Sequence, residues 1–209
     1  MIKSLYCGQL KVNTNAELMA VLRLANRFEV RPCLKLCCKR LQKLTMTFEM
    51  SVQILDACEK SPQSEEVKEL VALASSFLCS HFQCTHTSSW DSVKIREWQT
   101  LSPHALRLIL ASDCLYISYE EMAFEMLEMW ISANCKNCCD GVDNNERNRL
   151  LWEFGQFIRW PLMECFCLNR YLKKFGGTRA EQHPLRPLIV EALLYRASGI
   201  EEDSGKAVE

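Results

Sequence analysis

Two clusters of cysteine and histidine have spacings that could bind a metal ion. In the first, Cys135-Lys136-Asn137-Cys138-Cys139, two cysteines are separated by two residues in a segment expected to form a loop. Thiolates at this spacing can share a tetrahedral zinc ion if two further ligands approach. Cys165 and Cys167 could complete the set, but one intervening residue is an unusual separation and both lie in an expected helix. Free surface thiols are therefore the favoured interpretation.

The second cluster consists of Cys79, His81, Cys84 and His86, where a helix is expected to fray into a loop. The short spacing could suit a metal ion. Cys79 and His81 are more simply explained as part of the apolar face and edge of that helix. We therefore assign neither a metal site nor a cofactor from the sequence.

Cysteine chemistry also raises the question of a nucleophilic enzyme, which needs a thiolate next to a base. The chain has thirteen cysteines and four histidines, so chance pairings are easy to find and carry little information. No GxSxG, Walker-type glycine loop, HExxH or dinucleotide fingerprint occurs in the sequence. The sequence predicts a protein that is not an enzyme.

Charge and hydropathy exclude two classes of partner. Lys plus Arg number 25 against 26 for Asp plus Glu, and no long basic run occurs, so we expect no binding to nucleic acid. No apolar run approaches the length of a membrane-spanning helix, and the N-terminus lacks the apolar core of a signal peptide. We expect a nuclear or cytoplasmic protein with mostly free thiols. Several cysteines also sit in apolar patterns, as expected of core residues: Cys33, Cys37, Cys58, Cys79 and Cys114.

Low glycine and proline content favours helices as the elements that carry these residues. Only 7 Gly and 6 Pro occur, and no segment alternates strictly between apolar and polar residues. Residues that can cap a helix N-terminus precede successive apolar stripes; they are Thr14, Thr47, Ser64, Ser102 and Ser118. Thr14 with Glu17, and Ser118 with Glu121, have the spacing of a capping box.

The apolar stripes predict a series of helices. They are expected over 16–28, 32–41, 47–61, 64–81, 103–110, 119–131, about 146–160, 162–172 and 187–197. The first two should form a short antiparallel hairpin. The stretch between Trp90 and Trp98 is less regular, a polar loop is expected over 134–145, and residues 201–209 are predicted to be disordered.

The N-terminal hairpin contains Leu5-Tyr6-Cys7-Gly8-Gln9-Leu10, Glu17-Leu18, Leu24-Ala25-Asn26-Arg27-Phe28-Glu29-Val30, Cys33 and Cys37. With these residues it resembles the closing helices of a BTB/POZ domain. The region from Met46 to Leu172 contains Phe77-Leu78, Leu101-Ser102, Ile109-Leu110-Ala111-Ser112-Asp113, Tyr119-Glu120-Glu121, Trp130 and Arg159-Trp160-Pro161-Leu162-Met163. With these residues it resembles a BACK domain. The chain also contains Ala111-Ser112-Asp113-Cys114-Leu115 and Phe157-Ile158-Arg159-Trp160-Pro161, with which it looks most like plant proteins of the light-response and pollen armadillo-interactor type.

The resemblance implies an all-α fold, in which the C-terminal helical hairpin of a BTB domain is followed by a BACK-type bundle of antiparallel helix pairs. The implied limits are 1–44 for the partial BTB domain, 45–173 for the BACK domain, 174–198 for a loop and a C-terminal helix, and 199–209 for the tail. Compared with a complete BTB domain, the chain is expected to lack the N-terminal half. It is also expected to lack the β-rich domain that follows BACK in longer relatives.

For function, the resemblance implies a substrate-specific adaptor of a cullin-3-type E3 ubiquitin ligase, with the cullin scaffold, other BTB-BACK chains and protein substrates as partners. The alternative is a truncated interaction fragment that binds BTB-BACK partners without recruiting cullin. By family analogy, Phe48, Met50 and Ile54 would line a groove for the N-terminal segment of the cullin. The competing interpretation is that these side chains join the two domain cores, and Trp90 and Trp98 are likewise either partner anchors or core residues.

Overall fold

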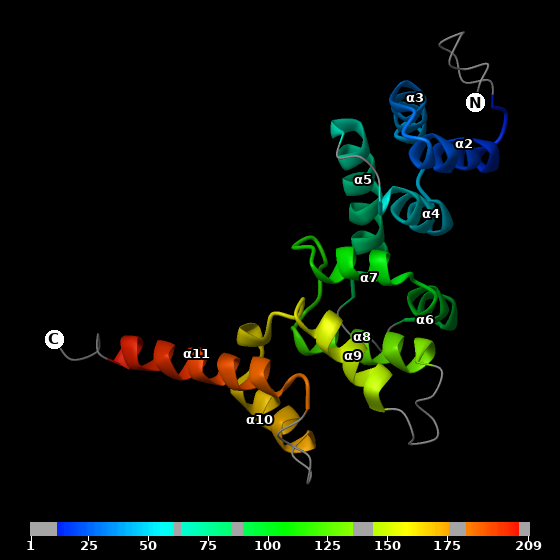
Figure 1. Ribbon diagram of the computed structural model, residues 1–209. Helices are drawn as coiled ribbons and strands as arrows, with labels where there is room; N and C mark the ends of the chain where they lie inside the picture. The colour runs from blue at the N-terminus through cyan, green and yellow to red at the C-terminus, as the bar shows by residue number, and fades with distance from the viewer. Residues whose placement is uncertain (1–11, 61–63, 85–89, 136–143, 176–182, 205–209) are drawn as a thin grey trace. The chain divides into compact units, whose positions relative to one another are not determined.

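A computed structural model describes residues 12–60, 64–84, 90–135, 144–175 and 183–204 of the chain. In these ranges the regular elements are helices, and the β pairing is an isolated parallel bridge between Cys84 and Ile117. The predicted all-α fold class is therefore confirmed (Figure 1). The chain divides into two compact units, Met1–Gln83 with Leu101–Tyr116, and Cys84–Thr100 with Ile117–Glu209.

In its described residues, the first unit contains an N-terminal hairpin and three further helices. Its helices are α2 (Asn15–Arg27), α3 (Arg31–Leu41), α4 (Phe48–Cys58), α5 (Glu65–Phe82) and α7 (Pro103–Leu110). The hairpin of α2 and α3 packs on α4 and α5, and α7 contacts α4 and α5 as well. Leu22, Leu41, Ile54, Leu70 and Ile109 are fully buried, so the predicted apolar faces form one core.

Local capping explains where these helices begin. Thr14 and Glu17 form the predicted capping box at α2, with the Thr14 hydroxyl accepting from the Glu17 backbone N–H. The hydroxyls of Thr47 and Ser102 cap α4 and α7 in the same way. Ser64 occupies the N-cap position of α5, but its side chain makes no capping hydrogen bond. Ser64 therefore lies at the predicted N-cap position, but the predicted capping hydrogen bond from its side chain is not formed.

The described part of the second unit contains α6 (Ser92–Gln99), α8 (Glu121–Asn134), α9 (Asn144–Gly155), the 3-10 helix η2 (Trp160–Leu162), α10 (Cys165–Lys174) and α11 (Arg186–Ser204). In Figure 1, α10 and α11 lie side by side, and α11 also contacts η2. Aromatic rings fill the interior: Phe124 lies 5.4 Å from Trp160 and 4.9 Å from Tyr171, between ring centroids.

Several boundaries in the second unit differ from the sequence prediction. The stretch described as irregular contains α6, which Asp91 caps by accepting from the Lys94 backbone N–H. The predicted capping box at Ser118 is wrong, because α8 starts at Glu121 with Glu120 as its N-cap residue and no side-chain cap. The predicted disorder of 201–209 is wrong for residues 201–204, which extend α11, while 205–209 lie outside the described residues.

The segment between α9 and α10 is also arranged differently from the prediction. Helix α9 ends at Gly155 and not at Trp160-Pro161, which instead form η2 with Leu162. A Cβ atom at position 155 would overlap with the side chain of Leu185. Glycine at this position therefore lets the Leu185 side chain lie close to the backbone of α9. Helix α10 consequently starts at Cys165, later than the predicted residue 162.

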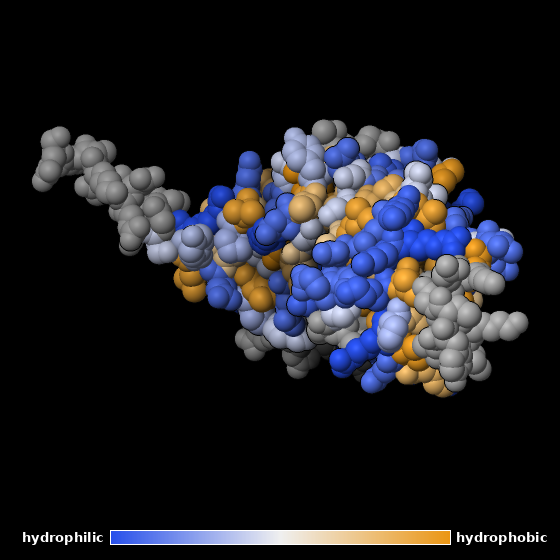
Figure 2. All heavy atoms as spheres, turned by 90° about the horizontal axis from the view of Figure 1, so that it is seen from above, coloured by the Kyte–Doolittle hydropathy of each residue, from blue (hydrophilic) through white to orange (hydrophobic). Residues whose placement is uncertain are grey.

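The surface of the molecule mixes polar and apolar side chains, and Figure 2 shows one face on which both kinds are interspersed. Several large apolar side chains are more than half exposed: Phe28, Val93, Leu162, Phe166 and Leu194. Among the described helices, none is both long and apolar enough to cross a membrane. The predicted domain limits at 44, 173 and 198 stay predictions. They refer to BTB and BACK family domains, whereas the two compact units reflect how the helices pack.

Candidate functional site

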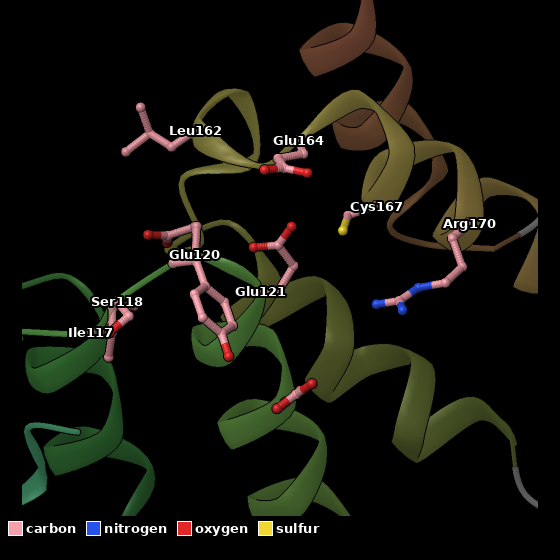
Figure 3. Close-up of a pocket in the computed structure, with 10 residues that line it drawn as sticks. Ile117, Ser118, Glu120, Glu121, Leu162, Glu164, Cys167 and Arg170 are labelled. Atoms are coloured by element: carbon pink, nitrogen blue, oxygen red, sulfur yellow. The ribbon is translucent and has the colours of Figure 1, made fainter. Parts of the chain in front are cut away.

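The second unit contains an open pocket of about 650 Å³ between the start of α8, η2 and α10. Four glutamates line it together with a cysteine and an arginine: Glu120, Glu121, Glu125, Glu164, Cys167 and Arg170. Figure 3 shows the side chains of Glu121, Glu164 and Cys167 directed toward a common space, into which Arg170 extends. We refer to this site as the acidic pocket.

Glu120 fixes one wall of the acidic pocket. Its side chain is almost fully buried and accepts a hydrogen bond from the backbone N–H of Arg159 at 2.8 Å. The Arg159 guanidinium lies 3.8 Å from the same carboxylate. Because both contacts come from the residue before η2, Glu120 joins the start of α8 to the chain entering η2 and α10. A buried carboxylate is tolerated when it is paired in this way.

Cys167 reports the electrostatic character of the acidic pocket. A hydrogen bond to Glu121 is the main cause that raises the pKa of this thiol to about 11, followed by burial and the negative charge of Glu121. The negative charge of Glu164 also raises the pKa, while Arg170 opposes the shift. A thiol with such a pKa is protonated at neutral pH, so it donates to Glu121 and is a poor nucleophile. Cys167 is therefore not suited to covalent catalysis in this environment.

The three residues predicted to line a cullin groove lie on α4 in the first unit. Ile54 is fully buried and Met50 is 7% exposed, so both contribute to the core in this conformation. Phe48 is half-buried, and its ring packs edge-to-face on Phe82 at 6.0 Å and near His81 at 5.8 Å. Phe48 alone of the three offers substantial surface to a partner, and the groove stays a prediction.

The two Cys and His clusters that the sequence analysis weighed as metal sites, and did not assign, can now be placed in part. Cys79 is buried, and burial raises the pKa of its thiol, as expected for a core cysteine. His81 stacks on Phe77 with ring centroids 6.0 Å apart, while His86 lies outside the described residues. Where the structure describes the chain, no group of three or more His, Cys, Asp or Glu side chains is arranged to hold a metal ion.

The loop cysteines depart from the expected free surface thiols. Cys135 is buried and disulfide-bonded, so the free-thiol prediction is wrong for this residue. A sulfur atom in a disulfide has no thiolate to offer a zinc ion. Cys138 and Cys139 lie outside the described residues. Most of the other described cysteines are free and buried, but Cys114, predicted to be a core residue, is exposed.

Trp90 and Trp98 are core residues of the second unit. Trp98 is fully buried, and its indole N–H donates to the backbone oxygen of Met126 at 2.8 Å. Trp90 is 6% exposed and its ring centroid lies 5.6 Å from that of Trp98. The pair joins α6 to α8, which supports the core interpretation of these residues over the partner-anchor interpretation.

The acidic pocket was not predicted from the sequence. Glu121 and Glu125 are four residues apart on one helix, a spacing that places both on the same face. That spacing alone is common on solvated helices, and nothing in the sequence brings Glu164 and Cys167 next to them. The pocket depends on the packing of α10 near the start of α8, which is a tertiary contact.

The described residues form an all-α module of packed helices. Comparison with known proteins identifies the family of this module. The family model named BACK, BTB And C-terminal Kelch, matches residues 52–173, more than half of the chain. The chain therefore belongs to the BACK family. The predicted BACK resemblance, which began at Met46, is confirmed over these residues.

Individual relatives extend the similarity to nearly the whole chain. BTB/POZ domain-containing protein At4g01160 of Arabidopsis thaliana is 27% identical over 202 residues, covering 96% of this chain and 36% of that protein. BTB/POZ domain-containing protein At2g46260 of the same plant is 27% identical over 199 residues, covering 94% of this chain and 33% of that protein. Kelch-like protein 28 of Homo sapiens is 23% identical over 176 residues, 84% of this chain and 27% of that protein.

The chain thus spans about a third of the length of the plant relatives that it matches. Similarity to two Arabidopsis BTB/POZ proteins, together with the family match, confirms the prediction of a plant-type BTB-BACK protein. The finer resemblance to the light-response and pollen armadillo-interactor type stays a prediction.

Proposed function

We propose that the chain functions as part of a substrate-specific adaptor of a cullin-3-type E3 ubiquitin ligase, acting by protein–protein contacts and without catalysis of its own. The observation that carries this proposal is the BACK match over residues 52–173 in a chain similar to BTB/POZ and Kelch-like proteins. The proposed partners are a cullin-3 scaffold, other BTB-BACK chains and protein substrates, in the nucleus or the cytoplasm.

The packing of the first unit supports a role in scaffold docking. The amide N–H of Asn26 on α2 donates to the backbone oxygen of Ala57 on α4 at 2.7 Å. Lys35 on α3 and Glu66 on α5 form an ion pair at 2.5 Å. Together with the buried apolar faces, these contacts join the BTB-like hairpin to the first BACK helices. A surface that spans both elements can then be presented to a partner in one fixed arrangement.

Binding to the purified N-terminal domain of cullin-3 tests the proposal. We expect the chain to be retained on the immobilised cullin domain. Because Phe48 has exposed surface on α4, Phe48→Ser should weaken this binding by about tenfold. Val93→Ser provides a matched control, since Val93 is 59% exposed on α6 in the second unit and should leave binding unchanged. Thermal unfolding of both variants checks that Phe48→Ser remains folded. Failure of the unmodified chain to bind cullin contradicts the adaptor proposal.

The alternative proposal is an interaction fragment that binds BTB-BACK chains without recruiting cullin. Co-purification with a full-length BTB-BACK partner, in the presence of the cullin domain, separates the two. Recovery of the partner chain without cullin supports the fragment, and recovery of cullin with the chain alone supports the adaptor.

A further inference from the structure

Helix α11 begins at a turn in which His183 makes two hydrogen bonds. The ring Nδ1 of His183 accepts from the backbone N–H of Leu185 at 3.3 Å, and the backbone oxygen of His183 accepts from the N–H of Arg186 at 3.1 Å. The backbone oxygen of Leu185 then accepts from the N–H of Ile189, one turn into the helix. Because a backbone N–H can only donate, Nδ1 carries no proton in this turn. The hydrogen bond that precedes α11 therefore requires neutral His183.

The same turn places two side chains against neighbouring helices. The ring of His183 stacks on Phe175, the residue that ends α10, with ring centroids 3.9 Å apart and an angle of 8° between the planes. The side chain of Leu185 is fully buried and lies close to the backbone of Gly155 at the end of α9. Helix α11 itself packs on α10 and η2. The neutral imidazole thus joins the start of α11 to the helices on which α11 lies.

The charges around His183 are unfavourable for a protonated ring. Among the described residues, the charged groups that act on it are Glu128 of α8, Arg147 of α9 and Lys174 of α10. Glu128 favours protonation, but its carboxylate already pairs with Arg147 at 3.2 Å and with Lys174 at 3.2 Å. A charged His183 would also lie at the N-terminus of α11, the positive end of the helix dipole. Three positive charges would then share one carboxylate.

Opposing effects act on the ring when it takes up a proton. An imidazolium stacked on Phe175 gains a cation–π attraction, and Glu128 attracts its charge. Against this, burial is the largest cause that lowers the pKa of His183 from the ordinary value of 6.5, followed by the positive charge of Arg147 and, more weakly, that of Lys174. The unfavourable effects are therefore larger. A role in packing alone explains the stack on Phe175 but not the hydrogen bond that Nδ1 accepts at the start of a helix.

We propose that His183 is a pH-sensitive latch, in which the neutral ring holds the start of α11 against α9 and α10, and protonation of the ring releases this helix. When the turn opens, the ring returns to water and to its ordinary pKa of 6.5, so the open form binds the proton more readily than the closed form. The stability that the latch contributes is complete above about pH 6.5 and is lost as the pH falls below that value. The latch goes beyond the proposed adaptor function, and it needs neither cullin nor a substrate to operate.

Hydrogen exchange of the full chain, measured by mass spectrometry at about pH 7.5 and about pH 5.5, tests the latch. Dividing each exchange rate by the intrinsic rate at the same pH gives the opening equilibrium of a segment. We expect the opening of residues 188–194 in α11 to increase several-fold at the lower pH, by at most about tenfold for each pH unit, because one proton is bound. Helix α2, which contains no histidine, is the internal reference and should change much less.

Two variants separate His183 from other titrating groups. In His183→Asn, the side-chain oxygen takes the place of Nδ1 and can accept from the N–H of Leu185 at either pH, so the pH dependence of α11 opening should be lost. His104→Asn is the matched control, because His104 lies near Glu59 in the first unit. This control should retain the full pH dependence of α11 opening.

Titration of the histidine ring resonances by NMR, in the unmodified chain, is a second measurement that does not depend on how well a variant folds. We expect the pKa of His183 to lie below 6.5. The proposal is overturned if this pKa lies at or above 6.5, if α11 opens equally at both pH values, or if α2 opens by the same factor as α11. It is also overturned if the pH dependence survives in His183→Asn or is lost in His104→Asn.

Discussion

At the scale of single residues, Glu29 occupies a position that normally belongs to glycine. It ends α2 with φ of 52°, in the left-handed region. Its N–H donates to Asn26 O at 3.0 Å, and the N–H of Val30 donates to Ala25 O at 2.8 Å, the hydrogen-bond pair of a Schellman motif. The turn between α2 and α3 therefore forms at the cost of an unfavourable backbone conformation for a residue with a Cβ atom.

Glu29→Gly should stabilise the chain by about 0.5–1 kcal/mol, because removing the Cβ relieves this conformation by more than the added flexibility costs. Urea unfolding followed by circular dichroism measures the change. Glu29→Ala is the control, since it removes the same carboxylate but retains a Cβ. A gain of equal size for alanine would show that the charge, and not the backbone, is responsible.

Two buried thiols on α3 lead to a prediction for alkaline pH. Burial raises the pKa of Cys37 and of Cys38 to about 12, from the ordinary value of 9.0. An unfolded chain releases these protons at lower pH than the folded chain, so the stability that they contribute is complete below about pH 9 and is lost as the pH rises toward 12. The free energy of unfolding should fall by up to about 1.4 kcal/mol per pH unit for each thiol in that window.

Urea unfolding at about pH 8 and about pH 10 measures this slope. Cys37→Ala/Cys38→Ala should show a clearly flatter dependence on pH, because lysines and tyrosines elsewhere contribute equally to both proteins. Identical slopes for the variant and the unmodified chain would mean that these thiols titrate alike in the folded and unfolded states.

At the scale of elements, helix caps give a matched pair of sites. The Thr47 hydroxyl accepts from the backbone N–H of Met50 at 3.3 Å, whereas Ser64 occupies the same position of α5 without such a contact. Thr47→Ala should lower the free energy of unfolding by about 1 kcal/mol, and Ser64→Ala should lower it by clearly less. Chemical denaturation of the two variants compares them directly. Equal losses would contradict the capping difference.

Helices whose caps and apolar faces are local features could be predicted from the sequence, and the others could not. Helices α2, α4 and α7 begin at residues whose hydroxyls accept from the first turn, so their starts were correctly predicted. The start of α8 was not, because the Glu120 carboxylate turns to the Arg159 backbone, a partner 39 residues away. The end of α9 at Gly155 was also not predicted, and the contact of Gly155 with Leu185 is likewise distant in sequence.

The candidate sites also divide into residues whose environment follows from the local sequence and residues that only tertiary packing brings together. Burial of Trp90 and Trp98 agrees with the core interpretation, which the sequence left open beside the partner-anchor interpretation. The acidic pocket combines α8, η2 and α10, and its existence depends on how these elements pack. The sequence shows where carboxylates occur, but periodicity alone does not reveal which carboxylates converge.

At the scale of the whole molecule, the chain passes between the two compact units at residues 83–84, 100–101 and 116–117. Helix α7 returns to the first unit after α6 has contributed to the second. Its residues Leu106, Ile109 and Leu110 are almost fully buried against that unit, and Ser102 donates to Asp56 at 2.5 Å. The first unit is therefore not a continuous segment, and a cut after Gln83 removes one of its helices.

A fragment of residues 1–83 should consequently be much less stable than a fragment of residues 1–116. Each buried leucine or isoleucine contributes roughly 1.5–3 kcal/mol, so loss of the three from α7 removes about 4.5–9 kcal/mol, comparable to the whole stability of a small domain. We expect 1–116 to unfold cooperatively in urea, and 1–83 to bind a dye for exposed apolar surface and to lack a cooperative transition. Equal urea midpoints for the two fragments would mean that α7 is not part of the folding core of the first unit.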